Sequence, residues 1–225
     1  RHQAVLYSER FFLRGRQAFL GEYDLSDTYA DLSIKAFDAY DEEWLDFVKE
    51  KNLKLDFITA HYYGTDRHKI NGEGDKFCVE SLVAREKEYE KVIADHGFAH
   101  IPLIIDEWGM AANGYLNIEE CPPFIARENE IFSAYFAKLI ARYIEEGFNI
   151  EKLMICLSGQ HEMVEDFTGF RNFFTLDFIK KPIYNAFILS SRLHENLLMS
   201  ATETKDLYVV ATKSNEGAYS VLASY

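Results

Sequence analysis

Two adjacent carboxylates close an apolar stretch near the middle of the chain. The segment Ile104 to Gly109 has the sequence IIDEWG. An apolar run that ends in polar residues is typical of a parallel strand buried on both faces, with its chemistry at the carboxyl end. A carboxylate held rigidly there, such as Glu107, can attack the anomeric carbon of a sugar, and Trp108 offers an apolar surface to the sugar's C–H groups. This segment taken alone fits equally well an acidic pair that caps a strand in a solvated loop.

A histidine and a tyrosine stand two residues apart at the end of another apolar stretch. Leu55 to Tyr63 has the sequence LDFITAHYY, and alternation along a strand turns His61 and Tyr63 to the same face. At a strand end these side chains can hydrogen-bond a sugar hydroxyl or orient a carboxylate. A structural role is the alternative for the histidine, but Glu107 on the following predicted strand favours the functional one.

Regular elements alternate along the chain from about residue 31, after a segment, 1–30, without a clear pattern. We predict strands near 32–37, 55–61, 102–109 and 152–158, and helices over 41–52, 80–96, 124–146 and 182–197. A hairpin follows near 207–223. Alternating strands and helices imply an α/β fold with a parallel sheet, whose strand ends meet at one edge. Gln160 and His161, which follow the last of these strands, should therefore lie near Glu107.

Four segments of the chain, in order, resemble the second half of the catalytic domain of glycoside hydrolase family 39. This family includes β-xylosidases and α-L-iduronidases and has (β/α)8 barrels with retaining chemistry. The segments that carry the resemblance are LDFITAHYY (55–63), IPLIIDEWG (101–109), PPFIARENEIFSAYFAKLI (122–140) and GFRNFFTLDFIKKPIYNAF (169–187). They are similar to the sixth barrel strand, the seventh strand, the helix after it, and the loop and helix that close the barrel.

The resemblance implies a fold and a set of roles. The fold is a partial (β/α)8 barrel over 31–198, with about four strand-helix units, followed by a hairpin over 199–225 that begins a β-sandwich. Glu107 becomes the nucleophile of a retaining glycoside hydrolase, and Asp106 a supporting acid. The residues expected to bind the oligosaccharide substrate are His61, Tyr63, Trp108, Gln160 and His161. Two carboxylates suffice for this reaction, so we expect neither a metal nor an organic cofactor.

The chain departs from the family pattern at the second carboxylate. Retaining hydrolysis needs a general acid/base about 5–5.5 Å from the nucleophile. In this clan it is the glutamate of an Asn-Glu pair at the fourth strand, whereas the Asn-Glu pairs here, 129–130 and 215–216, both follow Glu107. A full barrel also takes roughly 250 residues. We therefore expect the missing half of the barrel to come from upstream sequence. The alternatives are a second chain, a second copy of this chain, or residues 1–30 as a substitute for part of it.

The missing acid/base supports an alternative function, a non-catalytic carbohydrate-binding or scaffold module derived from a glycosidase. Cys156 supports it too, because it stands where the family has a sugar-lining tryptophan. Neither the nucleophile elbow of α/β hydrolases nor a dinucleotide or P-loop fingerprint occurs in the sequence.

Composition narrows the partners further. The 225 residues are 48% hydrophobic and 27% charged, as in a globular protein. Their net charge of −13 argues against nucleic acids and anionic membranes as partners, and no apolar run approaches the ~20 residues of a membrane span.

Three widely spaced cysteines indicate neither a disulfide framework nor a zinc site. The chain begins with Arg1 and no signal peptide follows, so we expect a processed or partial chain; a cytoplasmic and a secreted location both fit.

Overall fold

A computed structural model describes residues 44–64, 77–111, 113–157 and 163–225. Of these, 44–56 and 88–101 belong to one compact unit, and 57–87 and 102–225 belong to a second. The predicted strand near 32–37, the predicted start of the first helix, and Gln160 and His161 lie outside the described residues, as does the segment 1–30.

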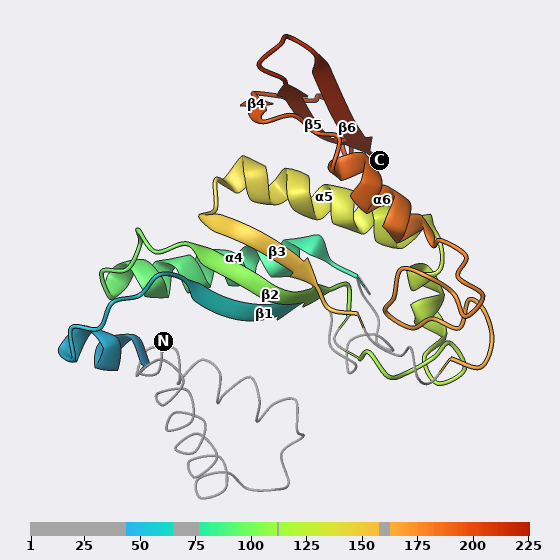
Figure 1. The fold of residues 1–225 in the computed structure, drawn as a ribbon, viewed down its shortest axis with the longest axis horizontal. Coiled ribbons are helices and arrows are strands. Elements are labelled where there is room, and N and C mark those ends of the chain that lie inside the picture. Colours follow the sequence, from blue (N-terminus) through green and yellow to red (C-terminus); the bar gives the residue numbers. More distant parts are fainter. Residues whose placement is uncertain (1–43, 65–76, 112, 158–162) are drawn as a thin grey trace, which may run out of the picture. The chain divides into compact units, whose positions relative to one another are not determined.

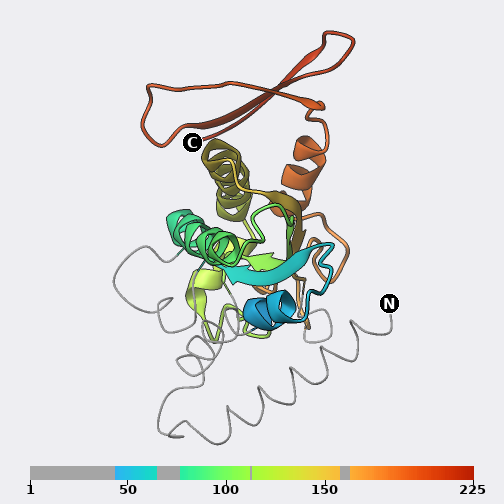
Figure 2. The same ribbon diagram turned by 90° about the vertical axis from the view of Figure 1, so that its left-hand side faces the viewer.

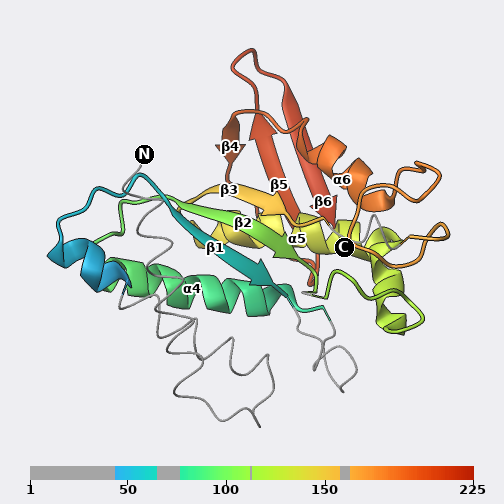
Figure 3. The ribbon, with the colours of Figure 1, turned by 60° about the horizontal axis from the view of Figure 1, so that its bottom comes forward.

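The second unit is built on a parallel sheet of three strands in the order β1-β2-β3. These strands are β1 (Ile58–Tyr63), β2 (Leu103–Gly109) and β3 (Ile150–Ile155). All three run in the same direction, as Figures 1 and 3 show, so that their carboxyl ends lie at one edge of the sheet. The prediction of an α/β fold with a parallel sheet is confirmed, although β1 begins three residues later than expected.

Two helices follow their sequence signals closely, and a third requires a correction. The predicted helix over 80–96 is α4 (Val79–Asp95), and residues 44–50 are helical as expected. The predicted helix over 124–146 is divided instead into a short 3-10 helix, η1 (Pro122–Arg127), and α5 (Glu130–Glu146). Asn129 separates them, because its extended backbone cannot continue a helix and its side chain accepts a hydrogen bond from the amide of Ile131 at 3.0 Å. Gly147 ends α5 at a φ of 72°.

An antiparallel sheet of three strands completes the second unit. The preceding helix, α6 (Pro182–Ser190), ends earlier than predicted, and the next strand, β4 (Asn196–Leu198), pairs with the predicted hairpin. That hairpin consists of β5 (Tyr208–Lys213) and β6 (Tyr219–Ser224). Helix α5 lies between the two sheets in Figures 1 and 2. On the side that faces the antiparallel sheet, Nζ of Lys138 lies 4.7 Å from the centre of the Tyr208 ring in β5.

None of the helices within the described ranges is long and apolar enough to span a membrane.

Candidate active site

An irregularity in β2 decides where Glu107 points. In a regular strand, Ile105 and Glu107 would share one face. The register between β1 and β2 shifts just before His61, which pairs with Glu107, and the register between β2 and β3 shifts between Ile105 and Trp108. As a result, Ile105 and Trp108 are both fully buried, while Glu107 between them remains partly exposed. A bulge of this kind re-aims a side chain next to a site, and here it frees Glu107 from the buried face.

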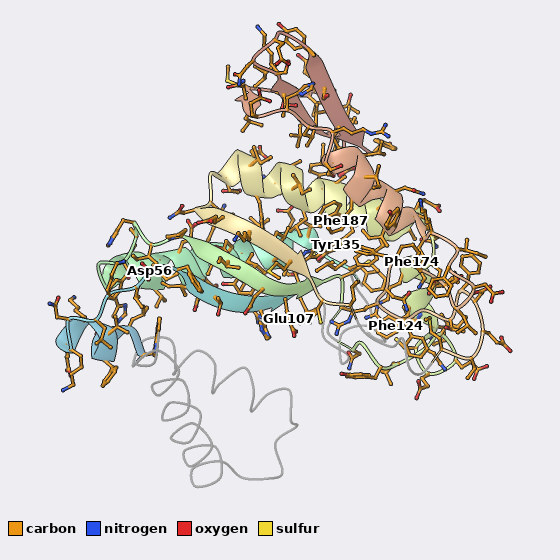
Figure 4. The ribbon with its side chains drawn as sticks, viewed as in Figure 1. Asp56, Glu107, Phe124, Tyr135, Phe174 and Phe187 are labelled. Atoms are coloured by element: carbon orange, nitrogen blue, oxygen red, sulfur yellow. The ribbon has the colours of Figure 1, made fainter. Side chains whose placement is uncertain are left out.

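Two side chains of β1 meet the Glu107 carboxylate. The hydroxyl of Tyr63 donates a hydrogen bond to Oε2 of Glu107 at 2.6 Å, and Nδ1 of His61 lies 3.5 Å from the same oxygen. The other ring nitrogen of His61 lies 3.3 Å from Oδ1 of Asp106. Tyr62 between them is buried on the opposite face, as alternation requires. Figure 4 shows Glu107 at the carboxyl end of the parallel sheet.

The surroundings of Glu107 favour its charged form. Burial raises the pKa of this carboxyl, but the hydrogen bond from Tyr63, the nearby His61, a hydrogen bond with Cys156 and the charge of Arg171 together lower it below its ordinary value. Burial also raises the pKa of Tyr63, as do its hydrogen bonds with Cys156 and Glu107, so the phenol keeps its proton and stays a donor. A carboxylate that remains ionised and fixed in direction suits nucleophilic attack.

Arg171 belongs to this cluster, although we had not predicted it. Its guanidinium lies 4.8 Å from the centre of the Tyr63 ring, and its Nη2 lies 3.4 Å from Sγ of Cys156. Arg171 is buried, and it comes from the loop between β3 and α6. The signal was present in the sequence, since this arginine follows Gly169 in a segment that resembles the family. The resemblance identifies this segment only as a loop that leads into a helix.

Trp108 is placed differently from our expectation. Its indole is fully buried and stacks nearly parallel to Phe136 of α5 and Phe187 of α6, with ring centres 5.4 and 6.4 Å away. Because the bulge turns this residue to the helix layer, Trp108 packs the sheet against the helices and has no surface to offer a ligand. We therefore withdraw Trp108 from the sugar-binding residues.

A comparison with protein families decides the affiliation of the chain. Residues 32–224 match the model of glycosyl hydrolases family 39. The chain belongs to this family. Among curated proteins, none matches the chain.

Solved structures of family 39 and related enzymes share the fold. A monomeric β-xylosidase from Caulobacter crescentus CB15 has a TM-score of 0.61 at 18% identity, over 87% of this chain and 43% of that one. A glucosidase from Croceicoccus marinus has a TM-score of 0.61 at 18% identity, over 82% of this chain and 36% of that one. A family 39 β-xylosidase from Caulobacter crescentus has a TM-score of 0.58 at 18% identity, over 78% and 34%. The chain thus spans less than half the length of these structures.

The other expected site residues of this family 39 chain are only partly placed. His61, Tyr63, Asp106 and Glu107 come together, whereas Gln160 and His161 lie outside the described residues. Within the described ranges, no group of three or more histidine, cysteine, aspartate or glutamate side chains could hold a metal ion.

Proposed function

We propose that this chain carries the nucleophile of a retaining glycoside hydrolase, and that Glu107 is that nucleophile. The observation that carries the proposal is the short hydrogen bond from Tyr63 to Glu107 at the carboxyl ends of two parallel strands. Membership of family 39 supports it, because the same segment resembles the strand on which that family places its nucleophile.

The contacts of Glu107 favour one of its two oxygens as the reacting atom. Tyr63 and His61 both approach Oε2, so Oε1 would form the bond to the anomeric carbon. The bond between that carbon and the leaving oxygen breaks at the same time, and the leaving group departs with the electron pair. Negative charge on Glu107 falls as the glycosyl-enzyme forms, and it returns when water releases the sugar. Tyr63 would hold the carboxylate in place through both steps.

The general acid/base has to come from elsewhere. Asn129 caps α5, so Glu130 lies in the first turn of that helix, and Glu216 lies in the turn between β5 and β6. Neither position is a strand end of the parallel sheet. We propose that further strands complete the (β/α)8 barrel and supply the acid/base, and that β4, β5 and β6 begin the β-sandwich that follows the barrel.

Trapping of a glycosyl-enzyme tests the nucleophile directly. The folded chain is incubated with 2-deoxy-2-fluoro glycosides whose good leaving groups need no acid catalyst, and its intact mass is measured. Xylosides and glucosides come first in the panel, because the solved relatives include xylosidases and a glucosidase. We expect a sugar adduct on the peptide that contains Glu107. The adduct should vanish in Glu107→Gln and should still form, although more slowly, in Asp106→Asn, which keeps the nucleophile.

A carbohydrate-binding module without catalysis is the second candidate, favoured by the absence of a strand-end Asn-Glu pair before Glu107 in the sequence. It predicts no adduct from any glycoside on a chain shown to be folded. Binding of the unmodified sugar, measured by calorimetry, would then remain in Glu107→Gln.

A further inference from the structure

A buried group of charged side chains lies next to the candidate site without touching Glu107. It consists of Arg127 at the end of η1, Glu128 after it, and Lys181 at the start of α6. Arg127 and Lys181 are each 1% exposed and Glu128 is 7% exposed. Charges this deeply buried are costly unless they are paired and hydrogen-bonded, so their contacts show what holds them there. We call these three residues the latch.

The contacts of the latch converge on two residues of the loop between β3 and α6. Nζ of Lys181 lies 2.7 Å from Oε1 of Glu128 and donates to the carbonyl of Phe170 at 3.1 Å. The same Glu128 oxygen accepts from the amide of Gly169 at 2.5 Å. Nη1 of Arg127 donates to the carbonyl of Gly169 at 3.1 Å. Three charged side chains thus hold the backbone just before Arg171 in place, two of them by direct hydrogen bonds to Gly169 and the third by one to Phe170.

Arg127 of the latch also binds the backbone that follows β2. Nη2 of Arg127 donates to the carbonyls of Ala111 at 3.1 Å and Asn113 at 2.9 Å, directly after β2. The guanidinium also lies 3.5 Å from the centre of the Phe124 ring, which is labelled in Figure 4. Arg127 therefore fixes the Gly169 backbone relative to the strand that carries Glu107. Two backbone segments far apart in the sequence are joined through one side chain.

Gly169 shows how closely the loop is seated. Its φ is +89°, which only glycine adopts readily, and a Cβ there would lie 2.6 Å from Cγ2 of Ile118 and 3.2 Å from Cβ of Phe124. A larger residue would require the loop or these neighbours to move. Arg171 follows two residues later and reaches Tyr63 and Cys156 from this fixed point.

We propose that Arg127, Glu128 and Lys181 are positioning residues that hold the guanidinium of Arg171 beside Tyr63 and Cys156. The functional meaning of this inference rests on the proposed role of Glu107, but the placement of Arg171 can be measured without any glycoside. Failure of the trapping experiment and failure of this proposal are therefore distinguishable.

The reactivity of Cys156 can report where the guanidinium of Arg171 lies. Cys156 is partly exposed, and its Sγ lies 3.4 Å from Nη2 of Arg171. Among the described residues, Tyr63 and Glu107 also lie close to it, with His61 beyond Glu107. The thiolate attacks an aromatic disulfide, forms a mixed disulfide and releases one aromatic thiolate. Two reagents are compared, a disulfide that carries two carboxylates and a neutral dipyridyl disulfide. A nearby guanidinium accelerates the anionic reagent selectively, so the ratio of the two rates reports the position of Arg171.

The experiment uses the full chain with Cys78→Ser and Cys121→Ala, which leaves Cys156 as its single cysteine. Arg171→Gln sets the scale, and we expect it to lower the rate ratio about fivefold, as expected for one charge at this range in water. The double variant Glu128→Gln/Lys181→Met removes both charges of the pair without leaving one unpaired, and we expect a comparable fall. Gly169→Ala displaces the same loop by a different physical change and should act alike.

Arg142→Met is the matched control. It removes the guanidinium of a residue in α5 that pairs with Glu80 of α4 and with Glu146, and it should leave the rate ratio unchanged. The proposal would be overturned if Arg171→Gln lowers the rate ratio while the double variant and Gly169→Ala, both folded, keep the parental ratio. An unchanged ratio in Arg171→Gln would overturn its premise. If the double variant does not fold, Gly169→Ala decides; if neither folds, the latch supports the whole unit rather than the loop, and the proposal fails.

Discussion

At the scale of single residues, the hydrogen bond from Tyr63 controls the ionisation and direction of Glu107. Tyr63→Phe removes this bond together with the hydrogen bond between the hydroxyl and Cys156, so we expect the pKa of Glu107 to rise. We also expect glycosyl-enzyme formation to slow by about tenfold, because a hydrogen bond to a charged group is worth about 1.5–3 kcal/mol and solvent screens part of it here. The rate of adduct formation against pH measures both effects.

Stability against pH gives an independent check of the same bond. The pKa of Glu107 is lowered in the folded protein, so its contribution to stability is present above the ordinary value of 4.5 and is lost as the pH falls through the folded value. The difference in unfolding free energy between the wild type and Tyr63→Phe should therefore shrink between pH 7 and pH 3. Tyr62→Phe, on the opposite face of β1, is the control and should show no such trend. A difference that is constant with pH would contradict the assignment.

At the scale of elements, the bulge in β2 divides two roles between neighbouring residues. It turns Trp108 into the aromatic layer with Phe136 and Phe187, so we expect Trp108→Ala to lower the unfolding free energy by about 3–5 kcal/mol. Urea denaturation measures the loss, and Trp108→Phe should lose less because it retains a ring. A loss below about 1 kcal/mol in Trp108→Ala would show that the indole is not part of the core.

The side chain that caps the start of α5 should contribute a smaller share of the unfolding free energy. The Asn129 side chain accepts from the Ile131 amide at the helix start, and loss of such a cap costs about 1 kcal/mol. We expect that loss in Asn129→Ala by urea denaturation, and nearly none in Asn129→Asp, which keeps the acceptor. Equal losses in both variants would mean that the amide group serves another purpose.

The same elements show what a sequence can and cannot predict. Apolar periodicity and glycine signals located α4, β2 and the end of α5 within a few residues, because burial and capping are local demands. The aim of Glu107 could not be predicted in this way: alternation from Ile105 assigns Glu107 to the buried face, and only pairing with β1 reveals the bulge. Arg171 was missed for a similar reason, since its place beside Tyr63 depends on contacts of the latch across more than 40 residues of sequence.

At the scale of the whole molecule, the described sheet has two edges, β1 and β3, that would be paired in a closed barrel. Phe57 beside β1 and Met154 in β3 are each about half exposed. If the other half of the barrel lies upstream in the natural protein, as we expect, then the edge amides of this chain should exchange with deuterium at least about tenfold faster than those of β2. The difference should be the same at low and high protein concentration. Equal protection of all three strands in a monomer would contradict this view, because other residues of the chain would then pair with β1 and β3. Protection of β1 and β3 that grows with protein concentration would identify a second copy of the chain as the missing half.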